Sequence, residues 1–347
     1  MNAIVKDLTH ASSGTAPEAP EQVVCSMVEA VTLALRHAMR EDPSVVLLGE
    51  DIGHNGGVFR ATAGLQEEFG IKRVMDTPLA ETLIAGVTIG MALQGLKPVA
   101  EIQFMGFIYA AMEQLVGHAA RMRNRTRGRL HCPMVIRAPF GGGIHAPEHH
   151  SESTEALMAH IPGLRVVIPS SPARAYGLLL AAIRNPDPVI FLEPKRIYRA
   201  VSQVITDNGE ALPLDTCFTL REGEHITLVS WGSMVQETLQ VADELAAKGI
   251  ATEVIDVATV SPLDMDTILC SVAKTGRCVI IHEAARSGGI GAEIAACLSE
   301  SALLDLRAPV RRVTGYDTIM PYFRNEKHYM PSVARIREAV EETLNYV

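Results

Sequence analysis

A glycine-rich segment at residues 141–153 (GGGIHAPEHHSES) carries three of the twelve histidines of the chain and two acids. It follows a short apolar run at residues 134–138, which is typical of a buried strand. Loops that leave strands are common positions for ligand sites in α/β proteins, and glycine lets a ligand approach the backbone closely. Imidazole gains and loses protons near neutral pH. The segment therefore predicts a proton-transferring site, with a solvated loop as the alternative.

Three other local patterns could also carry function. A transition metal bound by His145, Glu148, His149 and His150 is an alternative for the same loop, although the spacing differs from the helical pattern of zinc ligands. Residues 287–293 (SGGIGAE) lack the full glycine spacing of a dinucleotide loop, so we expect a tight turn between a strand and a helix. The five arginines within 121–129 are expected to complement a helix end and to pair with acids, with nucleic-acid binding as the alternative.

Composition restricts the classes of function. The chain has 347 residues and a formal net charge of −9, which argues against a general nucleic-acid binder. No apolar run approaches the roughly 18 residues that a membrane span needs. Residues 1–22 contain one lysine and no arginine, and we expect a disordered arm there instead of a signal or transit peptide. The six cysteines form no CxxC pair, which indicates reduced thiols and a reducing compartment, most simply a bacterial cytoplasm.

The elements that must position the loop follow an alternating α/β pattern. A helix is predicted from about Glu81 to Leu93, and another starts at Ser171-Pro172, with proline at the first helical position. Short apolar runs predict strands at 45–48, 74–76, 98–102, 134–138, 164–168 and 189–192. Strands alternating with helices indicate a parallel sheet covered by helices on both faces.

The pattern divides the chain into two α/β units. The first is expected to span residues 23–200, followed by a linker at 201–222, where periodicity is lost. The second unit, 223–347, is predicted to contain strands at 226–229, 253–257 and 278–282 and a last helix at 332–344. Within it, Ser233 is expected to cap a helix.

Several motifs together resemble one protein family. The chain is similar, over about residues 24–345, to the beta subunit of the thiamin-diphosphate-dependent decarboxylase component of 2-oxo acid dehydrogenase complexes, and pyruvate dehydrogenase fits best among them. The motifs are LGED at 48–51, DTPLAE at 76–81, GLKPVAE at 95–101, GGG to HHS at 141–151, PGL at 162–164, FLEPK at 191–195, SPLD at 261–264 and RVTG at 312–315. The resemblance implies a thiamin diphosphate-binding fold: a pyrimidine-binding domain followed by a transketolase C-terminal-like α/β domain.

The resemblance also implies roles for residues around the cofactor. Glu81 matches the glutamate that hydrogen-bonds the aminopyrimidine ring of thiamin diphosphate and favours the imino tautomer, which removes the thiazolium proton. Gln103 and Phe107 match positions that flank the pyrimidine, and Glu50 is a secondary candidate near the cofactor. Without the resemblance, each of these residues would be interpreted as part of a helix start or a packed helix face.

On the substrate side, His150 matches the histidine that faces the substrate and the incoming lipoyl group. His145 and His149 are expected only to shape the loop. The family also has a structural potassium ion held by backbone carbonyls, and the matching positions are Met134, Ala182, Ile183, Asn185 and Asp187. Carbonyl ligands leave almost no signal in the side chains.

One motif is absent from the sequence and bears on the quaternary state. The family holds the cofactor diphosphate through magnesium bound by a Gly-Asp-Gly motif, and this chain contains none. A diphosphate needs a neutralising cation, so a partner alpha subunit is expected to supply it, in an assembly of two alpha and two beta chains. The resemblance further implies docking to a lipoyl acyltransferase core and oxidative decarboxylation of pyruvate. A branched-chain 2-oxo acid or acetoin enzyme and a non-catalytic scaffold are the alternatives.

Overall fold

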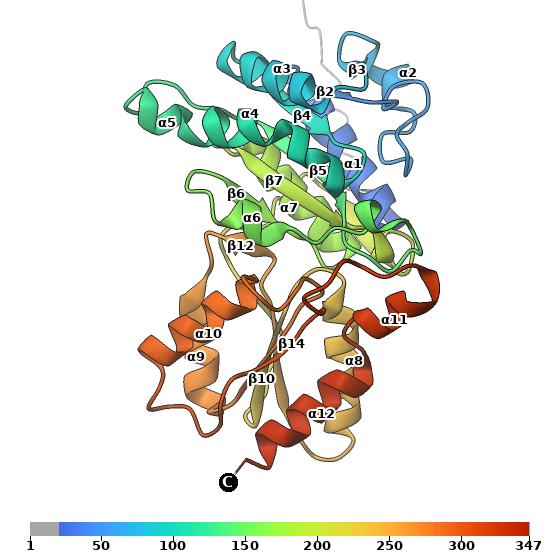
Figure 1. The fold of residues 1–347 in the computed structure, drawn as a ribbon. Helices are drawn as coiled ribbons and strands as arrows, with labels where there is room; N and C mark the ends of the chain where they lie inside the picture. Colours follow the sequence, from blue (N-terminus) through green and yellow to red (C-terminus); the bar gives the residue numbers. More distant parts are fainter. Residues whose placement is uncertain (1–20, 347) are drawn as a thin grey trace, which may run out of the picture.

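The computed structural model describes residues 21–346, which form two stacked α/β units (Figure 1). The predicted arm at residues 1–22 therefore lies mostly outside the described residues. Its last two positions belong to strand β1 (Glu21–Ser26), so the boundary predicted at residue 22 was wrong. No helix in the described range is both long and apolar enough to cross a membrane.

The first unit is built on a seven-stranded sheet, as the alternating pattern predicts. Its strand order is β12-β6-β7-β5-β4-β2-β3, and every pair is parallel except β12 with β6. The strands are β2 (Val45–Gly49), β3 (Val74–Asp76), β4 (Lys97–Glu101), β5 (Val135–Phe140), β6 (Arg165–Val167), β7 (Val189–Pro194) and β12 (Thr259–Ser261). Because the parallel strands run in one direction, their carboxyl ends share one edge of the sheet.

Helices cover both faces of this sheet, because both faces of its strands are apolar. In β5, Val135 belongs to the buried cluster with α1 (Met27–Glu41) and α7 (Pro172–Arg184), whereas Ile136 belongs to the cluster with α3 (Glu81–Leu93) and α4 (Met112–Gly117). The remaining short helices of this unit are α2 (Leu65–Phe69), η1 (Met105–Ala111), η2 (Ala119–Arg121), α5 (Met122–Arg125), η3 (Glu148–His150), α6 (Glu155–Ala159) and η4 (Lys195–Ile197).

Two helix starts follow the predicted chemistry. Helix α3 has the predicted bounds, and in α7 the Ser171 side chain accepts a hydrogen bond from the Arg174 N–H, with Pro172 at the first position. Ser233 was predicted to cap α8 (Met234–Ala246), and it occupies that position, but its side chain makes no capping bond. Its hydroxyl instead donates to Glu283, 2.7 Å away, so a long-range contact replaces the local one.

The second unit has a five-stranded sheet of order β14-β13-β10-β11-β9, parallel except at β9. Its strands are β9 (Phe218–Arg221), β10 (Ile226–Ser230), β11 (Thr252–Asp256), β13 (Cys278–Ile281) and β14 (Arg311–Val313). Its helices, besides α8, are α9 (Met265–Thr275), α10 (Ile290–Ser301), η5 (Phe323–Asn325), α11 (Glu326–Tyr329) and α12 (Val333–Leu344). Residues 287–289 lie between β13 and α10, so the predicted strand-to-helix turn is confirmed.

The segment at residues 201–222 was predicted as a linker, and this prediction was wrong. It contains β8 (Ser202–Asp207), which pairs antiparallel with β1, and β9, which extends the second sheet. Side chains alternate in β8, with Val204 60 % exposed and Ile205 buried. This alternation is too short to stand out in the sequence, and the strand partner lies far away along the chain.

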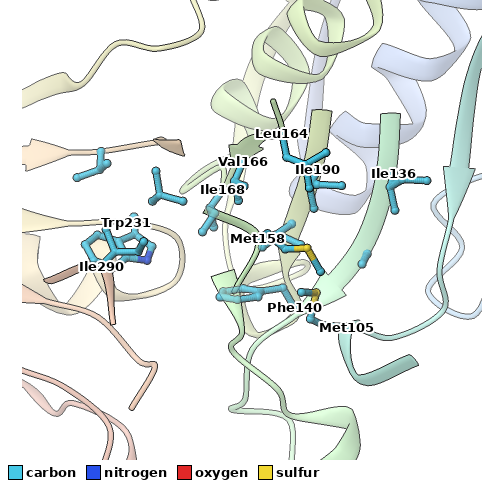
Figure 2. Packing of buried hydrophobic residues seen from close by; sticks show 14 of the residues in the cluster. Met105, Ile136, Phe140, Met158, Leu164, Val166, Ile168, Ile190, Trp231 and Ile290 are labelled. Carbon is cyan, nitrogen blue, oxygen red and sulfur yellow. The ribbon is translucent and has the colours of Figure 1, made fainter. Parts of the chain in front are cut away.

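The two units share buried apolar surface. One cluster joins Val166 and Ile168 of the first unit to Trp231 and Ile290 of the second, and Figure 2 shows these side chains with Met158 and Phe140. Strand β12 also crosses between the units, since it follows β11 in the chain but pairs with β6 of the first sheet. The predicted second unit, 223–347, therefore contributes a strand to the sheet of the first unit.

Candidate active site

The carboxyl edge of the first sheet gathers the predicted site residues. Gly49 at the end of β2 pairs with Asp76 of β3 and with Glu101 of β4, so the segments that follow these strands start side by side. Those segments carry Glu50, Glu81 and Gln103, while the histidine loop follows β5, the next strand along. Ligands in open α/β sheets bind outside such carboxyl ends.

Two acids lie together at this edge. Glu50 is only 6 % exposed, and the backbone of Ala80, the residue before Glu81, acts to lower its pKa. Burial, followed by the nearby charge of Glu81, raises the pKa of Glu50. Its Oε1 atom is buried and has no hydrogen-bond partner among residues 21–346. Glu50 is thus a buried acid with one carboxylate oxygen unpaired within that range.

Aromatic rings hold His150 in place. Its ring centroid lies 4.2 Å from that of Phe104 and 5.3 Å from that of Phe107, both in edge-to-face geometry. Burial lowers the pKa of His150, and the charges of His149 and Lys195 lower it further. The imidazole is therefore neutral at neutral pH. Its Nδ1 atom is buried without a partner in the described part of the chain, so the ring can accept a proton or a hydrogen bond.

The helix η1 and the histidine loop approach each other closely at Gly106. A Cβ atom at this position would lie 2.0 Å from the carbonyl oxygen of His149, so only glycine allows the contact. Phe107, which follows Gly106, packs its ring 5.4 Å from that of His149. The structure therefore places Phe107 against the histidine pair. His145 lies apart from the pair, with its side chain 68 % exposed.

Charged residues that the sequence did not single out lie behind the loop. Lys195 is 4 % exposed, and its ammonium group donates to the carbonyl of Gly141. Burial lowers the pKa of Lys195 to about 8. Glu155 is fully buried, accepts a hydrogen bond of 3.2 Å from the indole N–H of Trp231, and has its pKa raised by burial to about 8. Lys195 appeared in the sequence only as the end of the FLEPK motif, and no pattern around Glu155 marked it.

The predicted potassium positions gather where α7 ends and β5 begins. The carbonyl of Met134 accepts from the N–H of Val189 at 3.0 Å, and that of Ala182 accepts from the N–H of Asn185 at 3.2 Å. Asp187 uses both carboxylate oxygens to bind Arg123. The carbonyl oxygens of Met134 and Ala182 each retain a second lone pair for a cation. The potassium site therefore stays a prediction.

The structure supports neither a metal site in the histidine loop nor nucleic-acid binding by the arginine run. Within residues 21–346, no group of three His, Cys, Asp or Glu side chains is placed to hold a metal ion. In the arginine run, Arg123 pairs with Asp187, and Arg125 donates to the helix carbonyl of Gly117 at 2.9 Å. Both contacts match the expected roles of pairing with acids and of complementing a helix end.

Comparisons with known proteins agree with this architecture. Residues 24–201 match the transketolase pyrimidine-binding domain, and residues 216–336 match the transketolase C-terminal domain. Over 321 residues, 92 % of the chain, it is 47 % identical to the pyruvate dehydrogenase E1 component subunit beta of Bacillus subtilis (strain 168), of which 99 % is covered. Over 313 residues, 90 % of the chain, it is 49 % identical to the protein of the same name from Acholeplasma laidlawii, of which 96 % is covered.

A solved structure shares the fold. It is described as a split gene transketolase, inactive beta4 tetramer, and is 25 % identical in sequence with a TM-score of 0.76. The match covers 92 % of this chain and 98 % of the other. The second unit and its position beside the first sheet are therefore part of a shared two-domain arrangement.

Proposed function

This chain belongs to the family of pyruvate dehydrogenase E1 component beta subunits, and from that membership we propose how its residues divide the reaction with a partner chain. The protein is a subunit of an oxidoreductase that depends on thiamin diphosphate, decarboxylates pyruvate oxidatively and works with an alpha subunit. Nothing in the structure or in its relatives favours the branched-chain, acetoin or scaffold alternatives.

The residues at the carboxyl edge fit the cofactor. Glu50 Oε1, Thr77 Oγ1 and His150 Nδ1 are buried polar atoms without a hydrogen-bond partner in the described chain. Buried polar atoms in folded proteins are nearly always paired, so these three mark places where a polar ligand completes the site. Thiamin diphosphate, when bound, supplies the electron sink for breaking the bond to the substrate carboxylate.

We assign the pyrimidine contacts to the acid pair and its neighbours. Glu81, at the start of α3, would hydrogen-bond the pyrimidine ring and could exchange a proton with it when the cofactor is bound. Glu50, whose pKa is raised by burial and by Glu81, offers its free Oε1 beside that contact. Gln103 and Phe107 orient the ring from the neighbouring segment. The observation that carries this assignment is the convergence of Glu50 and Glu81 at one strand edge.

His150 serves the substrate side. Its lowered pKa keeps the imidazole neutral at neutral pH, so it can accept a proton or a hydrogen bond from the reacting group. The rings of Phe104 and Phe107 fix its orientation, which a general acid or base needs. His149 shapes the loop through its contact with Phe107.

The alpha subunit covers the exposed side of the acid pair. Leu79, just before α3, and Leu83 and Val87 on the helix are 82 %, 46 % and 40 % exposed. Apolar side chains in such a row mark a protein interface. The partner then supplies magnesium and the diphosphate contacts, in an assembly of two alpha and two beta chains. The four buried free cysteines among the described residues support the proposed location in a reducing bacterial cytoplasm.

Two further parts of the proposal concern more distant sites. The second unit docks the lipoyl acyltransferase core, which receives the acyl group. A potassium ion binds the carbonyls of Met134, Ala182, Ile183, Asn185 and Asp187 and stabilises the turn between α7 and β7. The clustering of these positions at one corner supports the ion site.

Titration calorimetry and activity assays test the split site. The isolated chain should bind thiamin diphosphate and magnesium very weakly, because most of the binding free energy comes from the charged diphosphate. Adding an alpha subunit with a Gly-Asp-Gly motif should restore tight binding together with turnover of pyruvate in preference to 2-oxoisovalerate. Tight, magnesium-dependent binding by the chain alone would contradict the proposal.

A further inference from the structure

Two carboxylates of the second unit bind the backbone of the loop that carries His150. Glu326, the first residue of α11, is 3 % exposed. Its Oε1 atom accepts a hydrogen bond of 2.5 Å from the N–H of Gly143, and its Oε2 atom accepts one of 3.0 Å from the N–H of His145. Both oxygens of one buried side chain are thus used to fix the first part of the loop.

Glu283 makes a similar contact at the ends of the loop. Its Oε1 atom accepts from the N–H of Gly142 at 3.2 Å and from the Ser153 hydroxyl at 2.6 Å. Its Oε2 atom accepts from the Ser233 hydroxyl at 2.7 Å. At Gly141, where φ is +80°, a Cβ atom would lie 2.0 Å from Glu283 Oε1. The glycine at this position is therefore required by the carboxylate as well as by the turn.

Lys195 connects these carboxylates to the histidine. Its buried ammonium group binds the carbonyl of Gly141, and the charges of Glu283 and Glu326 partly offset the effect of burial on its pKa. The ammonium also lies 6.0 Å from the ring centroid of Phe104, against which His150 packs. The loop is therefore held from one side by carboxylates at its N–H groups and from the other by a cation at its carbonyl.

From this geometry we propose that Glu326 and Glu283 are positioning residues, which set the orientation of His150 by fixing the backbone of its loop from the second unit. The inference rests on the role proposed above for His150. Hydrogen bonds to a charged acceptor are about twice as strong as neutral ones. A lost carboxylate would remove the acceptor from two N–H groups of the loop, those of the half-buried Gly143 and of the exposed His145, and the backbone there would be free to shift.

Glu326→Gln in the complex with the alpha subunit tests the proposal. The amide keeps the size of the side chain but presents an NH2 group to one of the two N–H donors. We expect kcat for pyruvate to fall about 10- to 100-fold, since a displacement of about 1 Å can cost a hundredfold. The affinity for thiamin diphosphate should change less than about twofold, because the acid pair is untouched. Glu326→Asp, which keeps both charged oxygens, should recover part of the loss.

Glu253→Gln provides the matched control. Glu253 is also a buried carboxylate of the second unit, 4 % exposed, and accepts from the N–H of Gly223 at 3.2 Å, but it does not touch the loop. Its variant should lose stability without losing turnover per folded complex. If Glu326→Gln behaves in the same way, with turnover per folded complex unchanged, the positioning role is refuted.

A double-mutant cycle with His150→Ala separates this inference from the proposed function. If Glu326 acts through His150, Glu326→Gln should cause little further loss in the His150→Ala background. An equal loss in both backgrounds would overturn the inference. If His150→Ala itself has no effect, the role proposed for His150 fails. In that case, hydrogen exchange still tests whether Glu326 anchors the loop. Faster exchange of the Gly143 and His145 amides in Glu326→Gln supports the anchoring, and unchanged exchange refutes it.

Discussion

Arg137 in β5 should carry a large share of the stability of the sheet below the active site. Its side chain is 1 % exposed and binds both oxygens of Glu193, at 2.6 and 2.9 Å, and Oε2 of Glu101 at 2.9 Å. The Tyr198 hydroxyl donates to the same Glu193 at 2.5 Å. Burial opposes the charge of Arg137, but the two carboxylates outweigh it and raise its pKa. Arg137→Met would leave both carboxylates buried without a cation.

The size of the effect follows from this geometry. Breaking a buried ion pair by removing one partner typically costs about 3–5 kcal/mol, because a buried charge is left uncompensated. At about 2 °C per kcal/mol for a chain of this size, the melting temperature should fall by roughly 6–10 °C at pH 7. Arg137 lowers the pKa of Glu101, which burial raises, so without the arginine this pKa rises further. The ionised carboxylate therefore destabilises the folded variant as the pH rises. The difference in melting temperature between the wild type and the variant should accordingly shrink between pH 7 and pH 5.

Thermal unfolding of the wild type and two variants at pH 5, 6 and 7 tests this reasoning. Arg123→Met is the matched control, because Arg123 binds Asp187 through the same type of fork at the exposed surface. It should change the melting temperature little, since solvent screens exposed pairs. The explanation would be refuted by equal shifts in the two variants, or by a deficit for Arg137→Met that does not depend on pH. Glu101→Gln and Glu193→Gln added to Arg137→Met should recover part of the loss.

Three further predictions concern the site. Glu81→Gln should reduce decarboxylation about 100- to 10,000-fold while the assembly with the alpha subunit persists; near-normal turnover in the reconstituted enzyme would contradict the cofactor role. His150→Ala should slow acyl transfer to lipoamide and leave thiamin diphosphate affinity comparatively intact; the reverse pattern, measured by calorimetry and single-turnover kinetics, would show that the role is misassigned. Because burial raises the pKa of Glu155 to about 8, the wild type loses stability as the pH rises from about 4.5 through 8. Glu155→Gln should therefore gain melting temperature relative to the wild type between pH 5.5 and pH 8.5, and a constant difference would refute this.

Much of the local structure could be predicted from the sequence, because short-range chemistry determines it. The bounds of α3 and the start of α7 at Ser171-Pro172 follow from periodicity and capping within a few residues. The six parallel strands of the first sheet lie in runs of apolar residues that are long enough to recognise. The motifs around Glu81 and His150 predicted the family, and the comparisons confirm it.

The tertiary structure decided the features that depend on distant partners. The ladder of β1 with β8 and the insertion of β12 beside β6 join segments whose own patterns are too short to indicate a strand partner. Ser233 occupies a cap position, yet its hydroxyl binds the carboxylate of Glu283, which is buried and therefore requires hydrogen-bond donors.

The anchoring of the loop shows the same division between sequence and tertiary structure. The glycines of 141–143 indicated a special backbone, but the reason for them lies in Glu283 and Glu326, which are more than a hundred residues away along the chain. No spacing rule links a glycine to a carboxylate of another unit. The sequence by itself determined which groups can do chemistry and where the local elements begin. Only the tertiary structure, within each unit and between the two, decided which charged groups are buried together, because burial and long-range hydrogen bonding are properties of the folded chain.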